Sequence, residues 1–271
     1  MENIAMKEKL KKGIYIFPSL FTCGNMACGF LSMLASIEGN FTKAAWLLIL
    51  SIAFDMLDGR VARMTKTTSE FGVQLDSLSD LVSFGLAPAV MMYQLVLNSM
   101  DKIGVAIAVL FVLCSALRLA KFNVTAKDGV VHSSFIGLPT PASAGLLISF
   151  VLSYELLIAE PGQALNFKTI PLLMKNMPVF FKLMPVVMVV LSLLMVSTVP
   201  YASFKKFKFA KPKAFQLLVL IIILIALIIV FPQNIIFILF LLYALSGIAN
   251  FILKYWNIIK RLSARKEKEI Q

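Results

Sequence analysis

The sequence predicts an all-α integral membrane protein that crosses the bilayer about eight times. Of its 271 residues, 59% are hydrophobic and 15% are charged, whereas soluble domains average roughly 45–50% and about 25%. The apolar residues fall into runs of about 20, the length at which a helix spans a hydrocarbon core of about 30 Å. A net charge of +12 accompanies these runs and favours an anionic lipid surface over nucleic acid as the partner of the basic residues. These observations exclude a soluble single-domain protein.

Eight apolar runs define the predicted helices. They lie near residues 18–37, 43–63, 72–97, 103–121, 138–157, 178–198, 214–231 and 234–254. Lysines precede the first run as in a signal peptide, but Glu8 interrupts them and the apolar stretch is long, so we interpret this run as a retained span. We expect residues 1–271 to form a single polytopic domain, with a basic segment over 1–17, a helical bundle over 18–254 and a basic tail over 255–271.

The distribution of Lys and Arg predicts how the bundle is oriented. Of the 26 basic residues, 21 fall in the N-terminal segment, in the C-terminal tail and in alternate loops near 60–71, 118–137 and 199–213. Because cytoplasmic loops carry an excess of Lys and Arg, we place these segments in the cytoplasm. The predicted location is therefore the cell (cytoplasmic) membrane, with both termini and the cluster of acids described next on the cytoplasmic side.

Four aspartates interrupt the apolar pattern at the cytoplasmic ends of the second and third runs. They are Asp55, Asp58, Asp76 and Asp80. An acid at the bilayer centre costs roughly 2.5–3.5 kcal/mol and marks a functional candidate. At about 100° per residue, each pair lies on one helix face beside small side chains. The four carboxylates thus predict an oxygen-rich cage for two divalent cations, Mg²⁺ or Mn²⁺. Pairing with arginine to join the helices is the alternative, which the scarcity of nearby basic residues disfavours.

A two-metal site of this kind suits phosphoryl transfer, because two cations hold a diphosphate and neutralise the leaving oxygen. The sequence contains neither a P-loop nor a glycine-rich dinucleotide motif, so a nucleotide would be held by metal and helix faces. A divalent-cation or proton transporter is the alternative from another class. A transporter needs polar groups through the full depth of the membrane, whereas the last two runs are almost purely apolar.

The same aspartates belong to a pattern that resembles the signature of the CDP-alcohol phosphatidyltransferases. The pattern is Asp55-x-x-Asp58-Gly59-x-x-Ala62-Arg63, then eight residues, then Gly72-x-x-x-Asp76-x-x-x-Asp80. This resemblance implies a membrane bundle of about six to eight helices, a homodimer and dependence on divalent cations. It also implies that Asp55, Asp58 and Asp76 hold the two metals, and that Asp80 binds the second metal and acts as the catalytic base.

The resemblance further implies a binding site for CDP-diacylglycerol. Its residues are Pro18, Thr22, Asn25, Gly59, Ala62, Arg63, Ser69 and Gly72. The first three share one face of the first helix at i, i+4 and i+7, which would form a wall of the nucleotide pocket. Close packing of helices through small residues is the alternative for this stripe.

Two further segments, 116–123 and 135–141, look like those of the phosphatidylserine synthase branch. This likeness implies attack by the hydroxyl of L-serine on the β-phosphorus of CDP-diacylglycerol, giving phosphatidylserine and CMP. Arg118 is a candidate for the serine carboxylate because a guanidinium fork matches it, with Lys121 and Asn123 as further candidates. Snorkelling is the alternative for Arg118. Glycerol 3-phosphate or inositol phosphate stays open as the acceptor, because the signature specifies the donor and not the nucleophile.

Overall fold

The computed structural model describes residues 2–65, 69–127, 135–159, 171–201 and 233–249, and a few single positions near the C-terminus. Its elements are helices α1 (Glu2–Ile37), α2 (Phe41–Thr65), α3 (Glu70–Asp80), π-helix η1 (Leu81–Leu86), α4 (Ala87–Leu95), 3₁₀-helix η2 (Leu97–Met100), α5 (Asp101–Lys127), strand β1 (Phe135–Ile136), α6 (Thr140–Ala159), α7 (Pro171–Val196) and strand β2 (Pro200–Tyr201). A further apolar helix, the C-terminal helix, covers Gln233–Ala249. The predicted all-α membrane class is confirmed, although the predicted helix at 214–231 lies almost entirely outside the described residues.

Several of the described helices are long and apolar enough to cross a membrane. Judged by length and composition, four stretches of the described chain qualify: Pro18–Ile37, Glu70–Leu95, Leu97–Thr125 and Pro178–Val196. Helix α2 is long enough, with 25 residues, but its C-terminal half carries two acids, Asp55 and Asp58, and two arginines, Arg60 and Arg63. Large apolar side chains also point outward along α5, such as Leu113 and Leu117 at 55% and 59% exposure. Such a surface belongs in lipid, so the chain is a multi-pass membrane protein.

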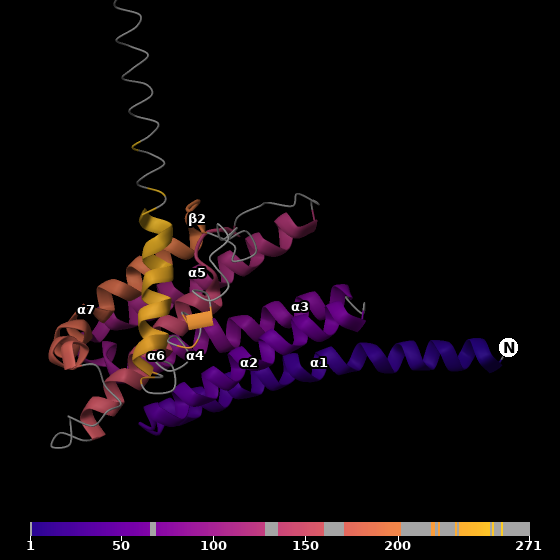
Figure 1. Ribbon diagram of the computed structural model, residues 1–271, viewed down its shortest axis with the longest axis horizontal. Coiled ribbons are helices and arrows are strands. Elements are labelled where there is room, and N and C mark those ends of the chain that lie inside the picture. Colours follow the sequence, from indigo (N-terminus) through magenta and orange to yellow (C-terminus); the bar gives the residue numbers. More distant parts are fainter. Residues whose placement is uncertain are drawn as a thin grey trace, which may run out of the picture.

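The helices that carry the four aspartates pack tightly against α1. Figure 1 shows α1, α2 and α3 side by side, with α1 extending beyond the other two toward the N-terminus. Ser32 on α1 donates a hydrogen bond to the Ala44 carbonyl of α2 at 2.9 Å. A side chain at Gly29 would collide with Ser83 of η1, so glycine is needed for this close approach. Small residues and interhelical hydroxyl bonds are typical of helix packing in membranes.

The predicted third span is a chain of three elements and not one regular helix. The α-helix α3 ends at Asp80, the π-helix η1 follows at once, and α4 continues to Leu95. A π-turn widens the helix locally and is frequently found at functional sites. Here the widened turn begins at the residue directly after one of the four aspartates.

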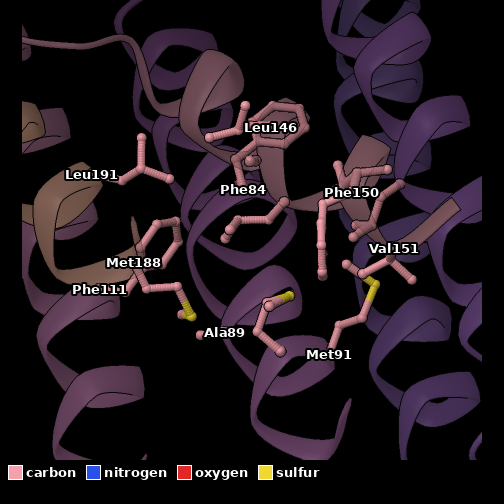
Figure 2. Close-up of a cluster of buried hydrophobic side chains, with 14 of the residues drawn as sticks. Phe84, Ala89, Met91, Phe111, Leu146, Phe150, Val151, Met188 and Leu191 are labelled. Carbon is pink, nitrogen blue, oxygen red and sulfur yellow. The ribbon is translucent and has the colours of Figure 1, made fainter. Parts of the chain in front are cut away.

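An apolar core holds the remaining helices together. Figure 2 shows Phe84 of η1, Phe111 of α5, Phe150 of α6 and Met188 of α7 pointing toward one another. All four side chains are fully buried, so helices distant in sequence share one core. Burial of each side chain of this size contributes roughly 1.5–3 kcal/mol relative to exposure in water; within a bilayer the gain comes chiefly from close packing.

A short antiparallel strand pair, absent from the predicted architecture, ties the segment before α6 to the end of α7. Phe135 pairs with Tyr201, and Ile136 with Pro200. Gly137 adopts φ 80° and donates its N–H to the Val199 carbonyl at 2.9 Å. A Cβ at this glycine would collide with the carbonyl of Met195. The turn therefore places Thr140, the first residue of α6, close to α5.

Candidate active site

Three of the four predicted metal ligands lie together where α2 meets α3. Asp55 comes from α2, and Asp76 and Asp80 come from α3; each offers a carboxylate oxygen, and these oxygens all lie within 4.8 Å of one another. Asp80 is the most enclosed of the three, at 9% exposure. The arrangement of α2 and α3 thus brings Asp55 next to two acids that lie 21 and 25 residues later in the sequence. The sequence predicted that the two helices present these acids on facing sides.

Asp58, the fourth aspartate, lies beside this group. It is one turn after Asp55 on α2 and is 5% exposed. Thr22 of α1 donates a hydrogen bond from Oγ1 to Asp58 Oδ2 at 2.9 Å, and Asp58 is near enough to repel the charges of Asp76 and Asp80. Asp58 therefore belongs to the same electrostatic cluster, although its carboxylate is not in the group of three whose oxygens lie within 4.8 Å of one another.

The cluster has the donor set that a hard divalent cation requires. The carboxyl groups of Asp55 and Asp80 approach to hydrogen-bonding distance, and the four aspartates repel one another. In the described part of the chain, Oδ1 of Asp76 is buried without a hydrogen-bond partner, and Arg118 is the cation that attracts Asp80. Buried carboxylates need compensation, and oxygen-only ligands suit Mg²⁺ or Mn²⁺. The residues therefore fit a divalent-cation site.

A cavity of about 200 Å³ adjoins the aspartates between α1, α2 and α3. Its lining residues are Pro18, Ser19, Thr22, Asp58, Gly59, Ala62, Arg63, Ser69, Gly72, Val73 and Asp76. Seven of the eight residues predicted to bind CDP-diacylglycerol are in this set. The cavity thus joins the predicted nucleotide residues to two of the predicted metal ligands.

Asn25 is the one of the eight residues that does not line this cavity. It is fully buried. Its Nδ2 instead points at Oδ1 of Asp80, at 3.5 Å, while Ser51 of α2 donates a hydrogen bond to its Oδ1. Pro18, Thr22 and Asn25 all lie on α1, but only Pro18 and Thr22 line the cavity. The side chain of Asn25 faces Asp80 instead.

Ser69 has a local structural role at the cavity. It is the N-cap of α3, and its Oγ accepts a hydrogen bond from the N–H of Gly72 at 3.0 Å. Such a cap satisfies a backbone donor that the helix leaves free. The same hydroxyl lines the cavity and keeps its own proton for a second partner.

The three predicted serine-binding residues lie in different surroundings. The charge of Arg118 attracts that of Asp80. Its Nη1 donates to Oγ1 of Thr140 at 2.5 Å, and its Nε is buried without a hydrogen-bond partner among the described residues. Asn123 donates from Nδ2 to Ser77 of α3 at 2.8 Å. The side chain of Lys121 is exposed. Arg118 is thus the one of the three whose charge is shown to act on an aspartate of the cluster.

Some residues of the site had no signal in the sequence. Ser51, Thr140 and Tyr243 contact or face the candidate residues: Ser51 bonds to Asn25, Thr140 to Arg118, and Tyr243 of the C-terminal helix lies near Arg118. Serines and threonines occur throughout these helices as ordinary packing residues. Spacing along one helix gives no information on a partner in another, so these contacts emerge only from the packed structure.

Comparison with known proteins supports the signature. The sequence profile of the CDP-alcohol phosphatidyltransferase family matches residues 15–173, which include all four aspartates and Arg118. The chain belongs to the CDP-alcohol phosphatidyltransferase family. This phosphatidyltransferase-family chain is 36% identical over 246 residues to the CDP-diacylglycerol–serine O-phosphatidyltransferase of Helicobacter pylori strain J99, covering 91% of this chain and 95% of that protein.

Two archaeal relatives match a shorter part of this CDP-alcohol phosphatidyltransferase. The archaetidylserine synthase of Methanothermobacter thermautotrophicus is 39% identical over 150 residues, which cover 55% of this chain and 63% of the relative. The CDP-diacylglycerol–serine O-phosphatidyltransferase of Methanocaldococcus jannaschii is 48% identical over 118 residues, or 44% of this chain and 53% of the relative. The predicted family is therefore confirmed.

Proposed function

We propose that this CDP-alcohol phosphatidyltransferase is a phosphatidylserine synthase, which transfers the phosphatidyl group from CDP-diacylglycerol to the hydroxyl of L-serine and releases CMP. The observation that carries the proposal is the position of Arg118, a partly buried cation close enough to attract the charge of Asp80. Asp80 does not line the cavity that contains the predicted nucleotide residues. The relatives from Helicobacter pylori and Methanocaldococcus jannaschii are named serine O-phosphatidyltransferases, which supports the same acceptor.

The four aspartates would hold two divalent cations, Mg²⁺ or Mn²⁺. When bound, the ions would neutralise the diphosphate and stabilise the leaving oxygen. Asp55, Asp76 and Asp80 supply the closely spaced oxygens, and Asp58 and Asp76 line the cavity. Oδ1 of Asp76, which is buried and has no hydrogen-bond partner among the described residues, supports this assignment.

The cavity would bind the cytidine diphosphate end of the donor. Gly59, Ala62 and Gly72 leave the helix backbones of α2 and α3 open to the ligand, and Arg63 provides a positive charge at the cavity wall. Pro18 and Thr22 form the opposite wall on α1. Guanidinium groups pair well with phosphate oxygens, so we assign Arg63 to the diphosphate.

Asp80 would act as the base in a direct displacement. The serine hydroxyl transfers its proton to the Asp80 carboxylate while its oxygen forms a bond to the β-phosphorus. The bond between that phosphorus and the bridging oxygen breaks, and the electron pair leaves with CMP. A positioned base contributes roughly 10²–10⁴-fold to such a step. Arg118 would hold the serine carboxylate near this base, with Lys121 and Asn123 as further candidates.

The site would face the cytoplasm, where serine and CMP are soluble, while the acyl chains of the donor stay in lipid. The basic N-terminal segment and tail support a cytoplasmic location for both termini. A homodimer in the cytoplasmic membrane is the assembly that family membership favours. Cross-linking of the purified protein in lipid nanodiscs would test the assembly.

The decisive experiment measures CMP release by the purified protein with CDP-diacylglycerol and Mn²⁺ or Mg²⁺. Serine, glycerol 3-phosphate and inositol phosphate are supplied separately, and the lipid product is identified by mass spectrometry. We expect CMP release and phosphatidylserine with serine. Turnover with a phosphorylated alcohol but not with serine would refute the proposed acceptor, and no turnover with any alcohol would refute the proposed reaction.

A further inference from the structure

Helix α1 contacts the aspartates at two levels. At the first level, the Thr22 side chain bonds to Asp58, and Ser79 of α3 donates to the Thr22 carbonyl at 2.9 Å. At the second level, three residues further along α1, the Asn25 side chain faces Asp80, and Ser83 of η1 donates to the Asn25 carbonyl at 2.9 Å. The backbone of α1 is thus fastened to the helices of the acids at the two residues whose side chains reach those acids.

The amide of Asn25 has a defined orientation. Ser51 of α2 donates its hydroxyl proton to Oδ1 of Asn25, because an amide oxygen accepts and an amide nitrogen only donates. The NH₂ group must then face Asp80, whose Oδ1 lies 3.5 Å from Nδ2. This distance is at the long end of hydrogen-bonding range, and catalytic hydrogen bonds often shorten when substrate binds.

We propose that Asn25, oriented by Ser51, is a positioning residue that holds the carboxylate of Asp80 in its working rotamer; this inference rests on the proposed function. Donation from the Asn25 amide occupies Oδ1 of Asp80 and leaves Oδ2 for the serine proton or for a cation. Asn25 makes this contact from α1 and does not line the nucleotide cavity.

The chemistry of the site explains why asparagine suits this position. Asn25 and Ser51 are both fully buried, so water cannot replace the amide as the donor to Asp80. An aspartate there would add a charge to a cluster that already repels itself. A leucine would remove the buried donor to the Asp80 oxygen, and the Ser51 hydroxyl would keep only its longer contact with the backbone carbonyl of residue 25, at 3.4 Å. Groups that orient metal ligands in this way typically change affinity or activity by about 10- to 100-fold when they are removed.

The neighbouring backbone supports a precise position. Gly29 lets Ser83 approach α1 closely, and Ser83 lies within the π-helix that begins directly after Asp80. The hydrogen bond from Ser83 to the Asn25 carbonyl therefore fixes α1 relative to the π-helix that directly follows Asp80, the proposed base. Because Asn25 is held by Ser51 at its side chain and by Ser83 at its backbone, it loses little additional conformational freedom during the reaction.

The test compares Asn25→Leu and Ser51→Ala with a matched control, Ser32→Ala. Ser32 also donates a buried hydrogen bond between α1 and α2, but it has no contact with an acid. We expect Asn25→Leu to lower kcat by about 10- to 100-fold and to weaken Mn²⁺ binding, measured by electron paramagnetic resonance, by about tenfold. The KM for CDP-diacylglycerol should stay within about twofold, because Asn25 does not line the cavity. Ser51→Ala should change kcat and Mn²⁺ affinity in the same direction and by less, whereas Ser32→Ala should change neither.

Three outcomes would overturn the inference. Wild-type kcat and Mn²⁺ affinity in Asn25→Leu would show that the contact has no role. A raised KM for CDP-diacylglycerol with unchanged kcat would return Asn25 to the nucleotide pocket. An equal loss in Ser32→Ala would show general loosening of the α1–α2 interface. If Asn25→Leu does not fold, as judged by gel filtration, Ser51→Ala decides. The assays use whichever alcohol supports CMP release, so an incorrect acceptor leaves the comparison valid, and Mn²⁺ affinity is measured without turnover.

Discussion

The proposed donor side and the proposed acceptor side of this site are built in different ways. The donor side uses α1, α2 and α3, and most of its residues fall within one signature between Asp55 and Asp80. The acceptor side is assembled from α5, from the start of α6 and from the C-terminal helix, which contribute Arg118, Thr140 and Tyr243. The two sides meet at Asp80.

The difference has a structural cause. Adjacent helices joined by a short turn bring the donor residues together by local pairing. The acceptor residues are held by longer-range contacts: Tyr201 of β2 donates a hydrogen bond to the Ala244 carbonyl at 3.2 Å and lies under Gly247, where a side chain would collide with its ring. Strand pairing thus links α6, α7 and the C-terminal helix around Arg118.

The largest effect should come from the residue that the two sides share. Asp80→Asn keeps the shape but removes the base, so we expect kcat to fall by about 10²–10⁴-fold, with little change in the binding of CDP-diacylglycerol. CMP release and equilibrium binding of the donor would measure the two quantities. Asp101→Asn is a suitable control, because Asp101 begins α5 away from the cluster and has φ 48°, which asparagine tolerates. Wild-type turnover in Asp80→Asn would show that Asp80 is not the catalytic base.

Arg118→Ala should separate the two sides. Loss of a charge-assisted hydrogen bond of about 1.5–3 kcal/mol predicts a rise of about 10- to 100-fold in the KM for serine, while the KM for CDP-diacylglycerol stays nearly constant. Initial rates at varied serine and varied donor would give both constants. Lys102→Ala, at the exposed start of the same helix, serves as the matched loss of a positive charge. Equal changes in both KM values would indicate that Arg118 supports the fold and not serine.

A smaller effect is expected at the partner of Arg118. Thr140→Val preserves the shape of the side chain but removes the oxygen that accepts from Nη1. We expect the guanidinium to lose its orientation and the KM for serine to rise by about 5- to 10-fold, in line with a net hydrogen bond of about 1 kcal/mol. The control Thr125→Val removes an exposed hydroxyl from α5. A change in the KM for CDP-diacylglycerol instead of serine would place Thr140 on the donor side.

The sequence predicted the donor side far better than the acceptor side. Helical periodicity alone placed each pair of aspartates on one face, and the structure brings Asp55, Asp76 and Asp80 together. The same periodicity did not predict that Asn25 faces Asp80. Spacing along α1 shows which residues share a face of the helix, but not which neighbouring residue each of them contacts. The partner of Arg118 depends on the strand pair that positions Thr140, and two-residue strands have no recognisable sequence pattern. Contacts set by chain folding over long separations were therefore beyond prediction.

The finest test on the donor side concerns the two roles of Ser69. Its hydroxyl caps α3 and lines the cavity, and substitution by alanine or glycine separates these roles. At an N-cap, alanine costs about 0.5–2 kcal/mol whereas glycine costs only a few tenths, yet both remove the hydroxyl. We expect both variants to raise the KM for CDP-diacylglycerol by about 2- to 5-fold, as for a lost hydrogen bond of about 0.5–1 kcal/mol, and only Ser69→Ala to lower the melting temperature. If the KM rises in Ser69→Ala alone, the serine acts as a helix cap and makes no contact with the nucleotide.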